Sequence, residues 1–114
     1  MDTSLLSLFL PDGVTEYFEL VDACHEGESL ILYLEEKPLL PDGYEQDKLE
    51  SKGFYDPIRI QDFPIRGKAC YLEVRRRRWK NHTTGKVVSR NWRLLAQGTR
   101  MTQDFATFLK GITR

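Results

Sequence analysis

The cationic side chains of this chain concentrate in one short stretch. Four consecutive arginines, Arg75–Arg78, stand directly before Trp79, and a turn-like segment separates them from a second stretch that contains Trp92. An arginine guanidinium binds phosphate through two parallel hydrogen bonds and stacks on bases, and a neighbouring tryptophan can stack as well. This pattern predicts contact with the phosphates and bases of a nucleic acid.

The candidate contact residues extend beyond the arginine run. They share a cationic or amide side chain or, in one case, a flat ring, and they are Arg66, Lys68, Arg75, Arg76, Arg77, Arg78, Trp79, Lys80, Lys86, Arg90, Asn91, Arg93 and Arg100. If bases are read, we expect Arg77, Arg78 or Asn91 to read them, because arginine and asparagine make the two-point contacts that distinguish bases. The remaining residues would bind phosphates.

Two other interpretations of the arginine run stay open. The arginines can pair with acidic side chains of the same chain, in which case each exposed pair contributes about 0–1 kcal/mol. They can also form a solvated strand edge that resists strand-to-strand aggregation. For Trp79 and Trp92, a place in the core competes with a role as a base-stacking platform.

A net charge of zero hides a separation of charge along the sequence. Residues 1–57 hold 14 acidic and 3 basic side chains, a net charge of −11, and residues 58–114 hold 3 acidic and 14 basic side chains, a net charge of +11. Such asymmetry favours a basic part that faces nucleic acid and an acidic counterpart. At 114 residues, of which 40% are hydrophobic, the chain is predicted to form one domain.

The first half of the chain predicts one helix, two strands and a loop. Segment 3–10 is a short amphipathic helix that begins at Thr3 or Ser4 and ends before Pro11. Alternating apolar residues predict two strands on either side of Glu26-Gly27. The segment 39–57 is rich in Pro, Gly and Asp and predicts a loop.

The second half predicts the strands that carry the arginines. In order, these elements are a strand from Ile58, a turn through Phe63-Pro64 and Arg66-Gly67, a strand from Lys68 to about Trp79, a hairpin turn over 81–86 with Gly85 at positive φ, and a partner strand over 87–95. Because side chains alternate along a strand, Cys70, Leu72 and Val74 would face the core, whereas the arginine end would leave it.

A C-terminal helix is predicted by apolar residues at the helical period, Met101, Phe105, Phe108, Leu109 and Ile112. Thr102 suits its N-cap and Asp104 its first turn. Together the elements predict a small single α+β domain with an antiparallel sheet, a short N-terminal helix, a basic hairpin and this C-terminal helix.

The second half also resembles the N-terminal region of bacterial insertion-sequence transposases. The resemblance is carried by Asp62-Phe63-Pro64-Ile65 with Gly67, by Tyr71, Leu72 and Val74, by Arg75–Arg78 and by segment 98–112. Some members of this class divide the protein into two chains, and the first is a short protein of this size. The resemblance implies a non-catalytic accessory protein that recognises or positions the terminal repeats of the element, with the separately encoded catalytic chain as a second partner.

The resemblance implies a zinc-ribbon-like scaffold, yet the expected cysteine ligands are missing. The chain has Trp79-Lys80-Asn81-His82 in place of a Cys-x-x-Cys pair, and it has no cysteine in segment 39–57. Tetrahedral structural zinc needs four nitrogen or sulfur ligands, and His82 supplies one. We therefore expect a metal-free hairpin in which Trp79 fills the space by packing, and we expect no other cofactor.

Enzymatic activity is not predicted. Cys24 and His25 are neighbours in a predicted strand, so their side chains point to opposite faces and do not form a nucleophile pair. Cys24 and Cys70 lie in apolar runs, which favours buried free thiols. The sequence has no run long enough to span a bilayer and no recognisable signal peptide, so we expect a cytoplasmic protein that binds neither a membrane nor a small-molecule substrate.

Two other functions stay open. The acidic half could hold the basic surface of the catalytic chain, or mask the hairpin until DNA arrives, which would make this a protein-interaction module. The chain could also bind RNA or any nucleic acid without sequence preference. A steep loss of affinity with rising salt is the signature of phosphate contacts and separates the nucleic-acid functions from the interaction module.

Overall fold

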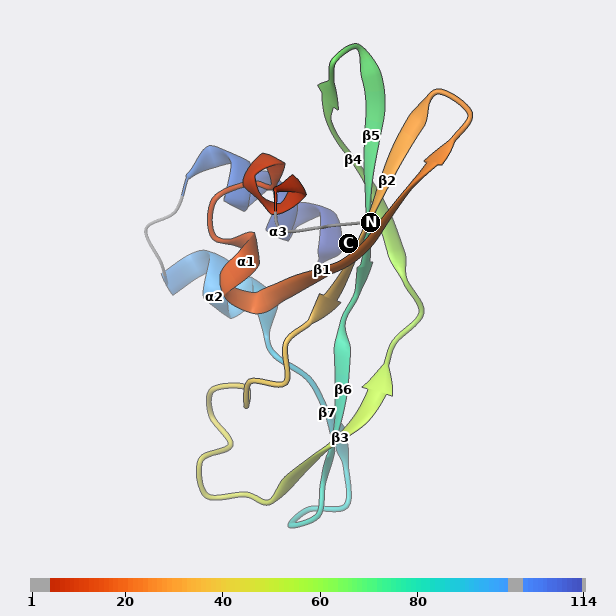
Figure 1. Ribbon diagram of the computed structural model, residues 1–114. Coiled ribbons are helices and arrows are strands. Elements are labelled where there is room, and N and C mark those ends of the chain that lie inside the picture. Colours follow the sequence, from red (N-terminus) through yellow and green to blue (C-terminus); the bar gives the residue numbers. More distant parts are fainter. Residues whose placement is uncertain (1–4, 99–101, 114) are drawn as a thin grey trace.

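The computed structural model describes residues 5–98 and 102–113, which contain helices and strands in mixed order (Figure 1). Along the chain the elements are η1 (Leu6–Phe9, a 3-10 helix), α1 (Val14–Tyr17), β1 (Phe18–Glu26), β2 (Ser29–Glu36), β3 (Leu49–Phe54), β4 (Ile58–Ile65), β5 (Lys68–Arg75), β6 (Arg77–Asn81), β7 (Val87–Val88), α2 (Trp92–Gly98) and α3 (Gln103–Ile112). The α+β fold class predicted from the sequence is confirmed.

The strands form two sheets that share one run of chain. The large sheet has the order β1-β2-β5-β4, and the small sheet has the order β3-β6-β7. Only Arg76 separates β5 from β6, so the chain passes directly from one sheet into the other (Figure 1). The strand predicted from Lys68 to Trp79 is therefore two strands, and the break between them lies inside the arginine run.

The large sheet is built from two antiparallel hairpins placed side by side. The turn between β4 and β5 consists of Arg66 and Gly67, as predicted, and both residues have positive φ. Phe63 and Pro64, predicted to be part of the turn, lie instead in an irregularity of β4. The hairpins meet where β2 pairs with β5, and this pairing is parallel, whereas the other four strand pairs are antiparallel.

The core lies between the large sheet and the helices on one of its faces (Figure 1). The predicted C-terminal helix is confirmed as α3, and Thr102 caps it by accepting a hydrogen bond from the Phe105 amide at 3.2 Å. Gly111 brings α3 very close to β4, because an added Cβ there would lie 2.9 Å from the Ile60 side chain. As predicted, Cys70, Leu72 and Val74 face this core.

The loop predicted over residues 39–57 is wrong in part, since it contains β3. This strand has a polar sequence, Leu49–Phe54, and pairs with β6 across a register shift. Nothing in its own pattern indicates a strand, because its stability comes from a partner strand distant in the sequence.

The partner strand predicted over residues 87–95 is also wrong after its first two residues. Val87–Val88 pair with β6, and the chain then turns into α2. The Asn91 side chain accepts a hydrogen bond from the Leu94 amide at 3.0 Å, which is the contact of a helix N-cap. This cap favours a helix over a strand, because the Asn91 side chain accepts a hydrogen bond from an amide of the first helical turn.

The N-terminal helix is shorter than predicted. Among the described residues it is the single 3-10 turn η1, and the predicted caps Thr3 and Ser4 lie outside that part of the chain. The helix ends before Pro11, as predicted. Gly13 at positive φ then starts α1, an element that the sequence pattern did not indicate.

Candidate nucleic-acid interface

Strand geometry sends the four arginines of the run to opposite sides of the protein. In β5 the even-numbered Cys70, Leu72 and Val74 are buried, whereas in β6 the odd-numbered Trp79 and Asn81 are buried, so the alternation changes phase across Arg76. Arg75, Arg77 and the pair Arg76 and Arg78 therefore take different surroundings. The single surface of four arginines that the sequence suggested is divided in two.

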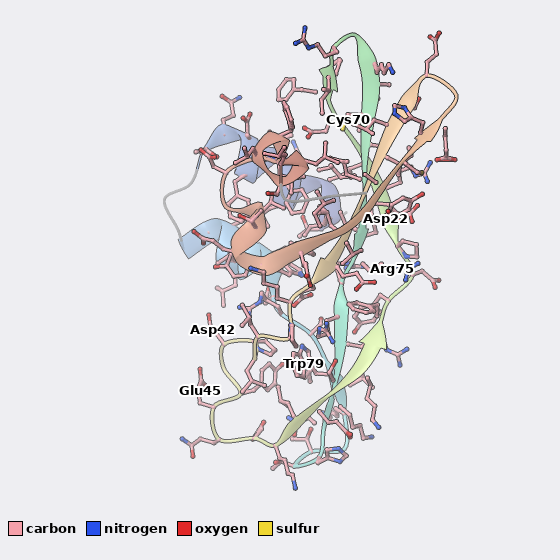
Figure 2. The ribbon with its side chains drawn as sticks, in the orientation of Figure 1. Asp22, Asp42, Glu45, Cys70, Arg75 and Trp79 are labelled. Atoms are coloured by element: carbon pink, nitrogen blue, oxygen red, sulfur yellow. The ribbon has the colours of Figure 1, made fainter. Side chains whose placement is uncertain are left out.

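Arg75 belongs to the large sheet's outer face, which is acidic. Its guanidinium lies 3.8 Å from Glu35, and Asp22 and Glu73 line the same shallow depression. Figure 2 shows Asp22 and Arg75 on the side of the large sheet away from the helices. For Arg75, the predicted pairing with the acidic half describes the structure better than phosphate contact.

Arg77 has an internal structural role. Its amide donates to Glu36 Oε1 at 2.9 Å, its Nε donates to the Glu36 carbonyl at 3.1 Å, and its guanidinium also bonds Ser51. The guanidinium lies 4.6 Å from the centre of the Phe54 ring. These contacts tie the end of β2 to the small sheet and leave Arg77 poorly placed to read bases.

Arg76 and Arg78, with Lys80 and the Tyr55 ring, form a surface on the small sheet that we call the basic face. The two guanidinium groups lie 5.4 and 5.7 Å from the ring centre of Tyr55, distances at which a cation and an aromatic ring attract. Lys80 donates to the Gly85 carbonyl at 2.8 Å. The one acidic neighbour across the strand pair, Glu50, is itself held by Lys52 and His82.

A groove of about 510 Å³ opens where the basic face meets the helices, and we call it the arginine groove. Its lining includes aromatic, cationic and hydroxyl side chains, namely Tyr44, Tyr55, Arg76, Arg90, Arg93 and Thr113. Three of these are arginines, and no Asp or Glu within the described ranges lines the groove. Arg76 has a buried Nε that lacks a hydrogen-bond partner among the described residues.

Arg90 is the most buried of the predicted contact arginines whose side-chain exposure is given, with 9% of its side chain exposed. Its guanidinium stacks over the rings of Tyr17 and Trp92 at 5.2 and 5.7 Å and donates to the carbonyls of Leu39 and Leu40 at 3.2 Å. These contacts fix its position at the wall of the groove.

Both tryptophans are packed in the protein, which corrects the prediction that Trp79 contacts DNA. Trp79 is 4% exposed on the covered side of β6, so it fills space by packing, as the resemblance implied. Trp92 is equally buried and stacks on Phe18 with ring centres 5.2 Å apart. Neither ring can stack on a base without leaving its place.

The remaining candidates are scattered. Arg66 and Lys68 lie at the tip of the β4–β5 hairpin, at the opposite end of the molecule from the small sheet (Figure 1). Lys86 is exposed beside the β6–β7 turn, and Arg93 lies at the arginine groove. Asn91 caps α2, and the predicted contact Arg100 lies outside the described residues.

The sequence pattern did not indicate a role for Glu36, which is buried where the end of β2 meets the small sheet. It is 2% exposed, and its Oε2 lies 3.9 Å from the Arg90 Nε. Burial raises the pKa of its carboxyl, and the Arg77 amide with the charges of Arg90, Arg77 and Arg76 offsets part of that rise. The alternation Leu30-Leu32-Leu34 extended by one step would have placed Glu36 on the inward face.

The two thiols differ in their surroundings. Cys70 is fully buried as predicted, and burial raises its pKa to about 11, so it is protonated at neutral pH. Cys24 is half-buried and lies 3.3 Å from the Tyr33 hydroxyl. Within residues 5–98 and 102–113, no three His, Cys, Asp or Glu side chains gather as metal ligands do.

Comparison of the chain with protein-family models, with curated proteins and with solved structures finds no match. The family resemblance in the second half therefore stays a prediction. None of the described helices is long and apolar enough to cross a membrane.

Proposed function

We propose that this chain is a non-catalytic DNA-binding accessory protein of an insertion-sequence transposase, which recognises or positions the ends of the element. The observation that carries DNA binding is the basic face, where Arg76 and Arg78 lie over Tyr55. In the described part of the chain, neither guanidinium enters an ion pair within 4.0 Å, so both are available to phosphates. The residue pattern of the second half supports the link to a transposase.

The spacing of the basic face suits a nucleic-acid strand. Residues on one side of a strand repeat about every 6.6 Å, so Arg78 and Lys80 lie about that far apart along β6, and Arg76 lies over the same Tyr55 ring as Arg78. Duplex DNA carries one negative charge per about 3.4 Å of each strand, so three cations in this arrangement face several consecutive phosphates. Cations in such a row bind the backbone and give register, whereas they carry no sequence information directly.

The test measures affinity for the terminal repeat of the element and for a scrambled duplex at two salt concentrations. We expect Arg78→Gln combined with Lys80→Gln to weaken binding and to lower the slope of log K against log salt by about 0.9 for each lost phosphate contact. The matched control, Arg75→Gln with Lys68→Gln, removes the same charge from the acidic outer face and the hairpin tip and should leave both quantities nearly unchanged.

The outcomes separate the functions that the sequence left open. Equal losses in the two double variants would mean that net charge alone drives binding, and this would contradict a role for the basic face. A preference for the terminal repeat supports end recognition, whereas equal binding to both duplexes leaves phosphate contact without sequence preference.

The acidic outer face supports a second candidate function, docking of the separately encoded catalytic chain. Its acidic side chains lie on the same side of the large sheet and are Glu19, Asp22, Glu26, Glu35 and Glu73. Arg59 pairs with two of them, Glu26 at 3.1 Å and Glu73 at 2.9 Å, and the others leave an excess of negative charge. Capture of the catalytic chain should then survive Arg78→Gln with Lys80→Gln, and loss of capture in that variant would count against this function.

A further inference from the structure

We infer that the arginine groove is a site for one phosphate group and that it fixes a DNA strand to the basic face. The inference rests on the proposed DNA binding and adds a defined binding site to it. The three arginines of the groove come from separate parts of the chain, with Arg76 between β5 and β6, Arg90 before α2 and Arg93 within α2. Three arginines that line one groove without a lining Asp or Glu match the charge of a phosphate.

Arg76 and Arg93 supply the donors for this site. Arg76 lines the groove, and its side chain makes no hydrogen bond within the described residues. Its Nε is buried, so the terminal N–H groups of the guanidinium are the donors that a phosphate would meet. Arg93 donates through one nitrogen to the Thr113 carbonyl at 2.9 Å, which holds its guanidinium beside the groove and leaves other N–H groups for a ligand.

Arg90 is a positioning charge in this site. Its guanidinium is fixed by two ring faces and two carbonyls, and two carboxylates lie near it, the buried Glu36 at 3.9 Å and the exposed Asp42 at 4.0 Å. These carboxylates balance part of its charge, and the rigid guanidinium holds the wall of the groove in place. The hydroxyl and amide groups of Tyr44, Tyr55, Ser89 and Asn91 line the same space and add neutral donors.

The size of the groove agrees with a phosphate that is part of a strand. At about 510 Å³ it is larger than a single phosphate needs and leaves room for the attached sugar. The groove also shares Tyr55 and Arg76 with the basic face, so a strand lying along β6 passes its mouth. The phosphate can come from within a strand or from its 5′ end, and the two sources are separable by experiment.

The test titrates inorganic phosphate into the full chain and follows the arginine Nε–H signals by NMR, with sodium chloride at equal ionic strength as the reference. We expect saturable shifts of the Arg76 and Arg93 signals. Arg93→Gln should lower phosphate affinity roughly tenfold or more, because a hydrogen bond to a charged group is lost. Arg76→Lys keeps the charge but loses the planar fork, and it should also weaken binding.

Arg75→Gln is the matched control, since it removes a neighbouring exposed arginine on the opposite side of the sheet and should leave phosphate affinity unchanged. Shifts that chloride reproduces, or an Arg93→Gln variant with unchanged affinity, would overturn the inference. Displacement of phosphate by a blunt duplex identifies internal phosphates as the occupant, and displacement only by a 5′-phosphorylated single strand identifies strand ends.

Failure of the site and failure of the proposed function give different results. DNA binding through the basic face without any saturable phosphate site would overturn the inference and leave the function standing. Saturable phosphate binding that no DNA displaces would keep the anion site and refute its role in DNA binding.

Discussion

At the scale of the residue, the most consequential side chain is the acidic Glu36, although the predicted contact residues are mostly basic. Glu36 is buried among Arg76, Arg77 and Arg90, where the Arg77 amide and guanidinium hold it to the small sheet. Its burial disfavours the charged form, and the arginines favour that form. Because the net effect is a raised pKa, burial is the larger influence.

The sign of this shift gives a pH prediction. The folded chain holds the Glu36 proton more tightly than the unfolded chain does, so this contribution to stability is full below the ordinary pKa of 4.5 and is lost as pH rises through the raised value. Relative to Glu36→Gln, whose side chain does not titrate, the unaltered chain should lose free energy of unfolding as the pH rises above 4.5. Urea unfolding at a series of pH values measures this loss, and an equal pH dependence in the two proteins would show that the arginines cancel the effect of burial.

At the scale of the element, the position of α3 depends on a glycine. Gly111 lets the helix approach β4 so closely that an added methyl group would lie 2.9 Å from the Ile60 side chain, less than a normal carbon contact. Buried Phe105, Phe108 and Leu109 then reach the core from the same helix. The helix in turn brings its last residues to the edge of the arginine groove.

Replacing this glycine sets two effects against each other. Gly111→Ala gains about 0.5–1 kcal/mol of helix propensity but overpacks the contact with Ile60, which costs about 1–3 kcal/mol. We expect a net loss of about 1 kcal/mol in the free energy of unfolding, measured in urea. Thr107→Ala, on the exposed side of α3, is the control and should be neutral or stabilising. A Gly111→Ala variant that is more stable than the unaltered chain would contradict the close contact between α3 and Ile60.

The elements also show what the sequence could and could not predict. The period and cap of α3 lie within one segment, and so do the Arg66-Gly67 turn and the alternation of β5, so each was predictable. β3 lacks a pattern of its own and is defined by its pairing with distant β6.

Within the candidate site, the directions of the arginine side chains depend on where the strand that carries them is interrupted. The four consecutive arginines gave no sign of the break at Arg76, so the sequence could not show that Arg75 and Arg78 face different partners. Position 90 was expected on a strand, and only the turn into α2 brings Arg90 against Tyr17 and Trp92.

At the scale of the whole molecule, the charge separation in the sequence becomes a separation in space. The chain measures 49 by 29 by 25 Å, with the β4–β5 hairpin tip at one end of Figure 1 and the small sheet at the other. The acidic outer face of the large sheet points away from the helices, and the arginine groove lies on the side where the helices pack. A DNA duplex and a partner protein with a basic surface would therefore bind to different surfaces.

This arrangement predicts which amides DNA protects. In hydrogen exchange with and without a bound duplex, protection should increase in β6 and in residues 87–93, beside the basic face and the groove. The hairpin tip at Arg66 and Lys68 should exchange at the same rate in both samples, although it also carries two basic side chains. Equal protection at the two ends would mean that DNA binds by charge alone and would contradict the proposed orientation.

The parallel pairing of β2 with β5 has a consequence for how the chain acquires its fold. Each hairpin joins neighbours in the sequence, but the pairing between them matches Leu30 with Cys70 and Glu35 with Arg75, forty residues apart. Closing so long a loop is slow compared with forming a hairpin. During synthesis, the β1–β2 hairpin must therefore wait with the edge of β2 unpaired until residues 68–75 have left the ribosome.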